Sequence, residues 1–378
     1  MLFLTLEQFL TLFDTKKTNT FTYFLDSALV RTSNQLVSLT TYIEKKDIDM
    51  KDIHIIFDAI QNKRDYLTRF YNKSLLPRIE KQNPKSFPVP MPENKINNNQ
   101  VVPYKNIIRN IHYKEILIST KSGLENLPTF LNVVSDLFVN YIIDYKLLCA
   151  SSRHYIRNGR IGSVFSSLFF RASIMNPFVV YSLNKSVLNG TKIFTPTLGW
   201  TSYCYGFLEC EEVIEYVGND VIQSVCASTE QFTKDYYPNK MVEIYESPSE
   251  NLLKNTKFTK KYREYFDTVF FSPPYYRLEL YPGSEQSTTN YKTYNEWLEG
   301  YWKPTILLCN YVLQKGGKLC YIISNYGGKE KYNLVDDMNK ITLDAGFSNY
   351  KILNMYNKNV NVNSNQTENT EKICIFIK

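Results

Sequence analysis

The stretch FDTVFFSPPYYRLELY, residues 266–281, decides the fold because it ends a hydrophobic strand in a rigid turn. Residues 266–272 are mostly aromatic or β-branched, which predicts a buried strand. The turn that follows consists of Ser272, Pro273, Pro274 and Tyr275. Two prolines fix two φ angles, so a hydroxyl, carbonyl groups and an aromatic ring are held together at the end of the strand. An ordinary structural turn would also explain the two prolines.

Strands alternate with helices on both sides of this stretch. We expect strands at 191–194, 214–220, 240–245, 266–272, 316–324, 349–357 and 371–378. We expect helices at 202–210, 221–232, 249–255, 293–314 and 333–346. Alternation of this kind predicts an α/β fold with a Rossmann-like, doubly wound sheet, and the last two strands are expected to pair antiparallel.

The sequence before residue 191 has a different texture. Residues 1–78 place apolar side chains at helical spacing, and residues 124–149 and 161–190 also read as helices. Residues 79–103 are rich in Pro, Asn and Lys, which predicts a linker. We therefore expect a basic, helical N-terminal region at 1–110, a helical lead-in at 111–190 and a sheet-containing domain at 191–378.

Charge and composition narrow the class of protein. The net charge is +7, with 16 Lys+Arg and 11 Asp+Glu in residues 1–110 and 28 and 26 in the rest. A basic bias suits a polyanion, although a solvated helical surface explains it equally well. The seven cysteines form no CxxC pair and only three histidines are present, so no metal site is expected. No membrane span or secretion signal is visible, and we expect an intracellular protein.

Two further loops are expected at the same edge of the sheet as the Ser-Pro-Pro-Tyr turn, because ligands bind where parallel strands end. In FTPTLGWTSYCYGF (194–207), a turn at Gly199 precedes a helix and exposes backbone N–H groups. In YVGND (216–220), Asp220 ends a strand, where a carboxylate can accept hydrogen bonds from both hydroxyl groups of a ribose. Asp220 is equally suited to capping the next helix.

The order of these motifs resembles the S-adenosyl-L-methionine (SAM)-dependent amino-methyltransferases of DNA. Ser272-Pro273-Pro274-Tyr275 resembles their [DNS]-P-P-[YFW] motif, TPTLGW (195–200) their cofactor loop, and YVGND their second acidic site. The segment RIGSVFSSLFFRASIMNPF (160–178) is similar to the element that closes over the methionine part of SAM. The resemblance covers about residues 155–378.

The resemblance implies a methyltransferase sheet, SAM as the cofactor and double-stranded DNA as the partner. The implied catalytic residues are Ser272, Pro273, Pro274 and Tyr275. The implied cofactor-binding residues are Thr195, Pro196, Thr197, Gly199, Trp200, Asp220, Val221, Ser249, Arg171 and Pro177. A flipped base would stack on Tyr275 while Ser272 and the Pro273 carbonyl orient its amine. Serine in the motif favours cytosine N4, and adenine N6 stays open.

Two residues depart from the pattern of the family. Thr195 stands where the family usually has Asp, and Thr201 stands where glycine is common. A β-branched residue does not readily adopt a positive φ angle, so Thr201 predicts a weakened cofactor loop. Two alternatives therefore stay open. One is a methyltransferase acting on RNA or another amine, and the other is an inactive relative that kept the fold as a nucleic-acid-binding or scaffold protein.

Overall fold

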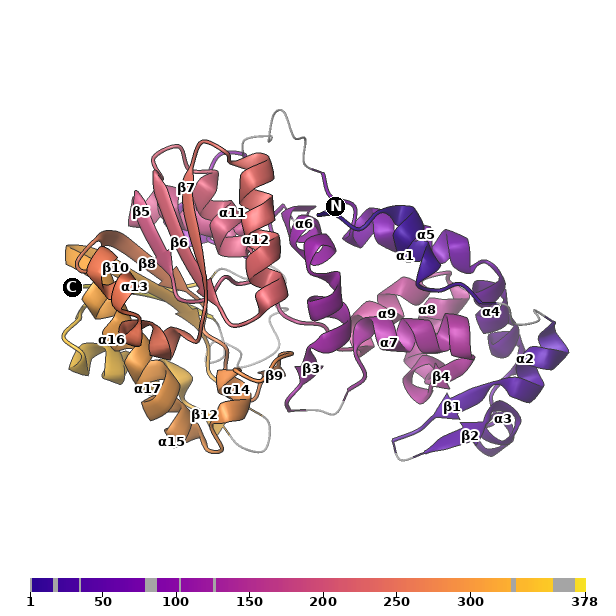
Figure 1. The fold of residues 1–378 in the computed structure, drawn as a ribbon. Helices are drawn as coiled ribbons and strands as arrows, with labels where there is room; N and C mark the ends of the chain where they lie inside the picture. Colours follow the sequence, from indigo (N-terminus) through magenta and orange to yellow (C-terminus); the bar gives the residue numbers. More distant parts are fainter. Residues whose placement is uncertain are drawn as a thin grey trace. The chain divides into compact units, whose positions relative to one another are not determined.

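The computed structural model describes residues 2–15, 20–33, 35–78, 87–101, 103–124, 127–327, 331–355 and 371–378 (Figure 1). The chain divides into two compact units. Apart from the first two residues, one comprises 3–76 and 113–172, and the other comprises 77–112 and 173–378. These boundaries differ from the expected ones. Within the expected linker, the described residues 87–101 and 103 belong to the sheet-containing unit, whereas residues 113–172 of the expected lead-in belong to the N-terminal unit.

The N-terminal unit is mainly helical, as expected. Its helices are α1 (Leu6–Thr11), α2 (Phe21–Ser27), α3 (Leu39–Lys46), α4 (Met50–Gln61), α5 (Lys63–Ser74), α7 (Phe130–Ser135), α8 (Ala150–Arg157) and α9 (Ile161–Leu168), with helical turns η2 (Glu115–Ser119), η3 (Asp136–Asn140) and η4 (Tyr145–Leu148). Strands β1 (Leu29–Arg31), β2 (Leu36–Ser38) and β4 (Ile142–Asp144) form a sheet in the order β2-β1-β4. Strand β3 spans Lys121–Ser122.

An ion pair with a buried carboxylate joins sequence-distant segments of this unit. The carboxylate of Asp52 on α4 is 2% exposed, and it accepts hydrogen bonds from Arg157 Nε at 2.7 Å and Nη2 at 3.0 Å. Arg153, also on α8, lies 3.5 Å away. Arg157 is half exposed, but removing the arginines would leave the buried carboxylate uncompensated. The expected helix at 124–149 is wrong at its end, because the backbone reverses at Tyr141 (φ 57°) and β4 then pairs parallel with β1.

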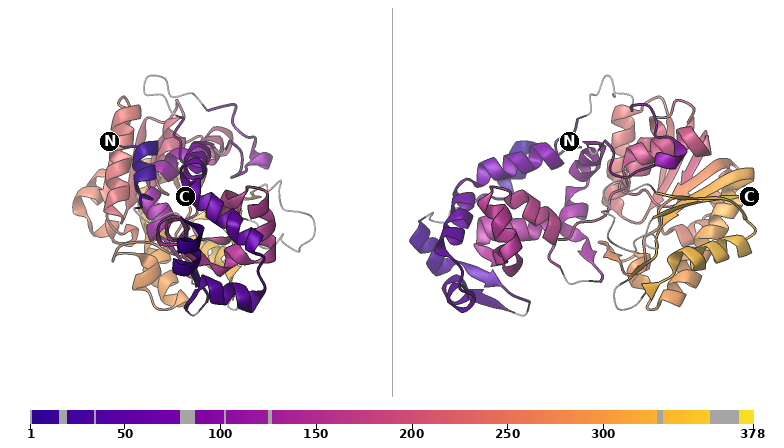
Figure 2. Two further views of the ribbon diagram at one scale, coloured as in Figure 1. Left: turned by 90° about the vertical axis from the view of Figure 1, so that its right-hand side faces the viewer. Right: turned by 180° about the vertical axis from the view of Figure 1, so that it is seen from behind.

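The second unit contains a seven-stranded sheet, which confirms the expected fold class. Its strands are β5 (Lys192–Thr195), β6 (Glu215–Asp220), β7 (Met241–Glu246), β8 (Phe266–Phe271), β10 (Leu313–Ile323), β13 (Ser348–Asn354) and β14 (Lys372–Ile377). Their spatial order is β13-β14-β10-β8-β5-β6-β7. β5, β6, β7, β8 and β10 are parallel, and β14 runs antiparallel between β10 and β13 (Figure 2).

Helices cover both faces of this sheet. They are α6 (Pro103–Ile111), α10 (Pro177–Leu183), α11 (Ser202–Leu208), α12 (Gln223–Tyr236), α13 (Thr256–Lys261), α14 (Ser287–Asn290), α15 (Tyr294–Trp297), α16 (Lys303–Val312) and α17 (Leu334–Asp344). Shorter elements are η1 (Glu93–Lys95), η5 (Asn184–Leu188), η6 (Ser249–Lys254), η7 (Leu298–Trp302), β9 (Glu279–Leu280), β11 (Tyr326–Gly327) and β12 (Lys331–Tyr332).

Successive side chains of β8 show how the layers form. Phe270 packs against Tyr203 and Phe207 of α11, with ring centroids 5.1 and 5.6 Å away. The next residue, Phe271, packs against Trp302 on the opposite face, at 5.5 Å. Neighbouring side chains of a strand point to opposite faces, so a strand of consecutive phenylalanines requires apolar helices on both sides.

The loops that leave the parallel strands β5, β6 and β8 therefore meet at one edge of the sheet. In the residues that the structure describes, no helix is both long and hydrophobic enough to cross a membrane. The same residues contain no cluster of three or more His, Cys, Asp or Glu side chains suited to holding a metal ion.

Candidate active site

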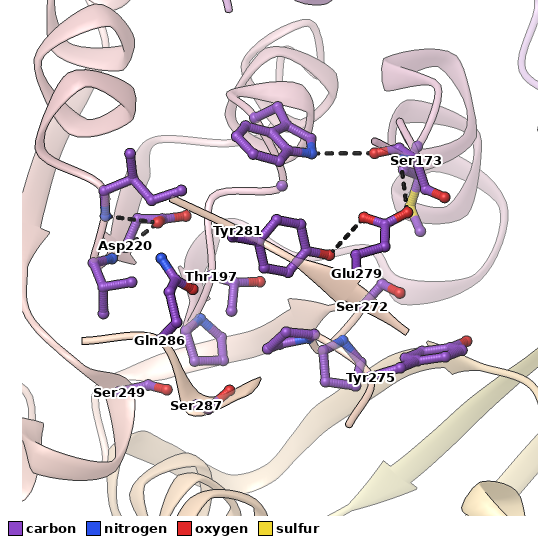
Figure 3. Close-up of a pocket in the computed structure, with 18 of the residues that line it drawn as sticks. Ser173, Thr197, Asp220, Ser249, Ser272, Tyr275, Glu279, Tyr281, Gln286 and Ser287 are labelled. Atoms are coloured by element: carbon purple, nitrogen blue, oxygen red, sulfur yellow. Dashed lines mark hydrogen bonds between the residues drawn. The ribbon is translucent and has the colours of Figure 1, made fainter. Parts of the chain in front are cut away.

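A cavity of about 320 Å³ opens at the edge of the sheet where β5, β6 and β8 end (Figure 3). It is lined by the Gly199 loop, the end of β6, the start of η6 and the Ser-Pro-Pro-Tyr turn. The predicted site residues that line it are Pro196, Thr197, Gly199, Trp200, Asp220, Val221, Ser249, Ser272, Pro273, Pro274 and Tyr275. Three predicted cofactor residues, Thr195, Arg171 and Pro177, do not line it.

Each of these three residues has a different structural place. Thr195 is fully buried, and its Oγ1 lies 2.6 Å from the hydroxyl of Tyr216 inside the sheet. Pro177 is buried at the first position of α10, where its fixed φ angle and missing N–H favour helix initiation. Arg171 belongs to the N-terminal unit, with its guanidinium 5.9 Å from the ring centroid of Phe130.

Hydrogen bonds to neighbouring strands hold the Ser-Pro-Pro-Tyr turn open toward the cavity. Ser272 Oγ donates to the carbonyl of Ile322 at 2.9 Å, so its lone pairs stay able to accept a hydrogen bond. The backbone N–H of Ser324, just after β10, donates to the hydroxyl of Tyr275 at 2.8 Å. This bond fixes the far end of the Tyr275 ring, and the turn presents one ring, one hydroxyl and two prolines to the cavity (Figure 3).

The Gly199 loop has three successive residues with positive φ angles, namely 52° at Gly199, 60° at Trp200 and 69° at Thr201. A Cβ atom at Gly199 would lie 2.2 Å from the ring of Tyr203, so only glycine fits there.

We expected Thr201 to weaken this loop, but two residues distant in the sequence contact its hydroxyl group. Thr201 is fully buried, and its Oγ1 lies 2.7 Å from both His112 Nε2 and Thr229 Oγ1. Thr229 Oγ1 in turn donates to the carbonyl of Val225 at 2.7 Å. Hydrogen bonds in a buried site offset a backbone strain of about 1–3 kcal/mol. The threonine hydroxyl thus holds the positive φ angle that glycine would adopt freely.

The carboxylate of Asp220 is held by three backbone N–H groups, and it does not cap α12, whose N-cap residue is Ile222. Its Oδ1 accepts from the N–H groups of Val221 and Ile222, at 2.9 and 3.1 Å, just before α12 begins. Its Oδ2 accepts from the N–H of Leu198 at 3.2 Å, which ties the Gly199 loop to β6. A carboxylate has about four acceptor positions, so about one is left to face the cavity.

The polar lining is acidic. The carboxyl groups are those of Asp220, Glu250, Glu279, Glu285 and Glu371, and no Lys or Arg lines the cavity. Burial raises the pKa of four of these groups, and only Glu285 is an exposed residue. Such a lining favours a neutral or cationic ligand over one that inserts a phosphate.

Some buried oxygen atoms of the cavity lining have no hydrogen-bond partner among the described residues. Two of them are Asn219 Oδ1 and Ser287 Oγ. The Nδ2 of Asn219 donates to the carbonyl of Pro196, which leaves its oxygen for the cavity. Unsatisfied buried polar atoms are rare in folded proteins, so these two atoms indicate a polar ligand.

Sequence reasoning missed several lining residues, among them Asn98, Tyr203, Glu279, Ser324 and Glu371. Asn98 comes from the segment expected to be a linker, where its Oδ1 accepts from the N–H of Asn176 at 2.7 Å. Glu279 accepts from the N–H of Ser173 and the hydroxyl of Tyr281, at 2.9 and 2.8 Å (Figure 3). The position of Glu371 could have been predicted from the sequence, because an antiparallel strand begins at the edge where parallel strands end.

Comparisons with known proteins give structural similarity without sequence similarity. No family model matches the chain, and no curated protein is significantly similar to it. Among solved structures, TrmN from Thermus thermophilus shares 11% identity at a TM-score of 0.37, over 55% of this chain and 50% of TrmN. Thus the chain spans half the length of that structure.

Two other solved structures show how broad the similarity is. Magnesium protoporphyrin IX methyltransferase from Synechocystis PCC 6803, with bound SAM, shares 14% identity at a TM-score of 0.34, over 60% of this chain and 83% of its own. The [4+2]-cyclase SpnF shares 11% identity at a TM-score of 0.35, over 50% of this chain and 75% of its own. These similarities assign no activity or ligand to this chain.

Proposed function

We propose that the chain is a SAM-dependent methyltransferase that methylates the exocyclic amine of a flipped DNA base, either cytosine N4 or adenine N6. One observation carries the proposal: the Ser272–Tyr275 turn faces the same cavity as Gly199 and Asp220. A methyl donor held by the Gly199 loop and an amine held by the turn would therefore meet in one enclosed space.

The cofactor half of the cavity fits SAM. The free acceptor position of Asp220 and the unpartnered Oδ1 of Asn219 would meet the ribose hydroxyl groups. The adenine would lie near Ser249 and Glu250. The acidic lining suits the positive charge of the sulfonium and of the methionine ammonium. Thr195 lies outside the cavity, so we assign it no contact with the cofactor.

When bound, SAM supplies an electrophilic methyl group on its sulfonium sulfur. The protein's own residues would then act by alignment. Ser272 Oγ and the Pro273 carbonyl accept the two amine hydrogens, and Tyr275 stacks on the ring, so the nitrogen lone pair faces the donor. In the transfer itself, a C–N bond would form as the C–S bond breaks, the neutral thioether would leave, and the amine would release one proton to water.

The basic residues that would contact a nucleic acid are unevenly distributed over residues 1–110. Residues 1–76 carry 10 Lys+Arg and 9 Asp+Glu, whereas residues 77–110 carry six and two. The basic excess of residues 1–110 therefore comes mainly from the segment grouped with the sheet. We place the basic contact with DNA phosphates in that segment, because the N-terminal stretch is nearly neutral.

The experiment compares Tyr275→Ala and Tyr275→Phe with the wild-type protein. Loss of the ring should lower kcat by about 100-fold or more, because alignment is lost, while the Kd for SAM stays within about twofold. Tyr275→Phe keeps the stacking ring and should retain most activity. Equal loss of SAM binding and turnover in Tyr275→Ala would contradict the role of Tyr275.

The acceptor is identified by incubating the protein and labelled SAM with unmethylated bacterial DNA and, separately, with RNA. Modified nucleosides are then analysed. Methyl transfer to DNA supports the proposal, and transfer to RNA alone replaces DNA by RNA. A protein that does not bind SAM in calorimetric titration is the inactive relative, and the proposed function then fails.

A further inference from the structure

Glu371 occupies a distinctive place beside the Ser-Pro-Pro-Tyr turn. It comes directly before β14, which pairs antiparallel with β10 so that Lys372 lies opposite Ile323. Glu371 therefore lies next to Ser324, whose N–H fixes the hydroxyl of Tyr275. All three residues line the cavity. The carboxyl group thus belongs to the part of the cavity that would receive the acceptor.

Among the cavity carboxyl groups whose pKa is raised, Glu371 alone has a side chain to which the described residues supply no hydrogen bond or salt bridge. Asp220 accepts three backbone N–H groups, Glu279 accepts two hydrogen bonds, and Glu250 accepts one from Tyr291 at 3.5 Å. Glu371 is half-buried and lines the cavity, so a ligand in the cavity can reach its carboxyl group.

Burial favours the neutral form of Glu371. Burial raises the pKa of Glu371, and the positive charge of Lys105 on α6 opposes this shift. The hydroxyl groups of Tyr203 and Tyr275 are close enough for the Glu371 charge to raise the pKa of each phenol. A neutral carboxyl group donates one hydrogen bond and also accepts, whereas a carboxylate only accepts.

The hydrogen-bond donors and acceptors that the acceptor base must present follow from this chemistry. Ser272 and the Pro273 carbonyl account for both hydrogens of the amine in the proposed function, which leaves the adjacent ring atom of the base without a partner. On the Watson–Crick edge that atom is a hydrogen-bond acceptor in cytosine (N3) and adenine (N1), whereas in guanine it is N1–H, a donor. A flipped base is read on this edge, and a donor in the pocket discriminates between the two patterns.

We infer that Glu371 donates a hydrogen bond to the ring nitrogen beside the acceptor amine and thereby selects cytosine or adenine over guanine. This inference rests on the proposed function. It makes Glu371 a specificity-determining residue that contacts the acceptor and has no part in holding the cofactor.

The test compares Glu371→Ala, Glu371→Gln and a surface control, Glu299→Ala, whose carboxylate is 65% exposed. Each variant receives labelled SAM and unmethylated bacterial DNA. Glu371→Ala should lower kcat/KM for DNA on the order of tenfold with an unchanged Kd for SAM. Glu371→Gln should lose much less, because its amide N–H donates to the same nitrogen. Glu299→Ala should match the wild-type protein.

A modified acceptor then isolates the single contact. A duplex containing the methylated site is made with 3-deazacytosine or 1-deazaadenine, in which a C–H replaces the ring nitrogen. On that duplex the wild-type protein and Glu371→Ala should be equally slow, because the contact is already lost.

Three results would overturn the inference. They are full activity of Glu371→Ala, a parallel loss of SAM affinity in that variant, and a product methylated at guanine N2. A wild-type protein that transfers no methyl group refutes the proposed function instead, so the two failures are distinguishable.

Discussion

The two halves of the cavity are built in opposite ways. In the half formed by the Gly199 loop and β6, the three N–H bonds of Asp220 and the two contacts of Thr201 fix the backbone, although Asn219 Oδ1 has no partner among the described residues. In the half formed by the Ser-Pro-Pro-Tyr turn, the described residues supply no hydrogen bond to the carboxyl group of Glu371. The first half is therefore preorganised by hydrogen bonds, whereas the carboxyl group of Glu371 in the second half is not fixed in this way.

This difference separates two kinds of effect on the protein. Substitutions in the preorganised half should change the stability of the fold and cofactor affinity together, because the same hydrogen bonds serve both. Substitutions in the acceptor half should change turnover with little change in stability. Thr201 and its partner His112 belong to the first half, and Glu279 lies between the halves.

The largest effect is expected for Thr201→Val, which keeps the branched shape at a positive φ angle but removes the hydroxyl. His112 loses its partner and Thr229 loses one of two, so the free energy of unfolding should fall by about 2–3 kcal/mol. SAM affinity should fall at least tenfold, measured by calorimetry. Thr201→Ser keeps the hydroxyl and is the matched control. Similar stability of the two variants would show that Thr201 is held by packing alone.

An intermediate effect is expected from His112. Burial lowers the pKa of its imidazole to about 3, from an ordinary value near 6.5. Between these values the unfolded chain binds a proton that the folded protein does not, so His112 makes stability decrease as pH falls from 6.5 toward 3. The loss should reach about 2 kcal/mol at pH 5.

Urea unfolding at pH 5 and pH 7 measures this contribution. In His112→Gln, which does not titrate, the change in unfolding free energy between these pH values should be smaller by that amount. An unchanged pH dependence would mean that the imidazole is accessible to water in the folded protein.

The smallest effect is expected for Glu279, which lines the cavity between the halves. Burial raises its pKa, so its contribution to stability is present below its ordinary pKa and is lost as pH rises through the raised value. Glu279→Gln removes the charge and keeps both contacts, because its Oε1 accepts from the N–H of Ser173 and its Nε2 donates to the hydroxyl of Tyr281. It should raise Tm by a few degrees at pH 7. The gain should disappear near pH 4 in a thermal scan, and a destabilised variant would show that the ionised form is required.

Much of the fold was predictable because each strand of the parallel sheet has its own local signal. Residues 266–271 are hydrophobic on both faces, and the structure covers both faces with helices. The cavity was predictable for a related reason, since ends of parallel strands meet at one edge. The roles of the predicted site residues stay predictions.

The properties that depend on distant partners were not predictable. The rule that disfavours a positive φ angle at Thr201 is local, whereas His112, 89 residues earlier, supplies the compensating bond. Asn98 lies in a segment whose Pro and Asn content indicates a linker, yet hydrogen bonds join it to residues 174 and 176. Local composition carries no information about such pairings.

The position of β14 has a consequence for how the protein is made. This strand comes after every other strand of its sheet in the sequence, yet it lies between β10 and β13. During synthesis, β10 therefore has an open edge until residues 372–377 leave the ribosome. A nascent chain lacking them would present unpaired backbone groups to chaperones, so assembly of the cavity follows completion of the sheet.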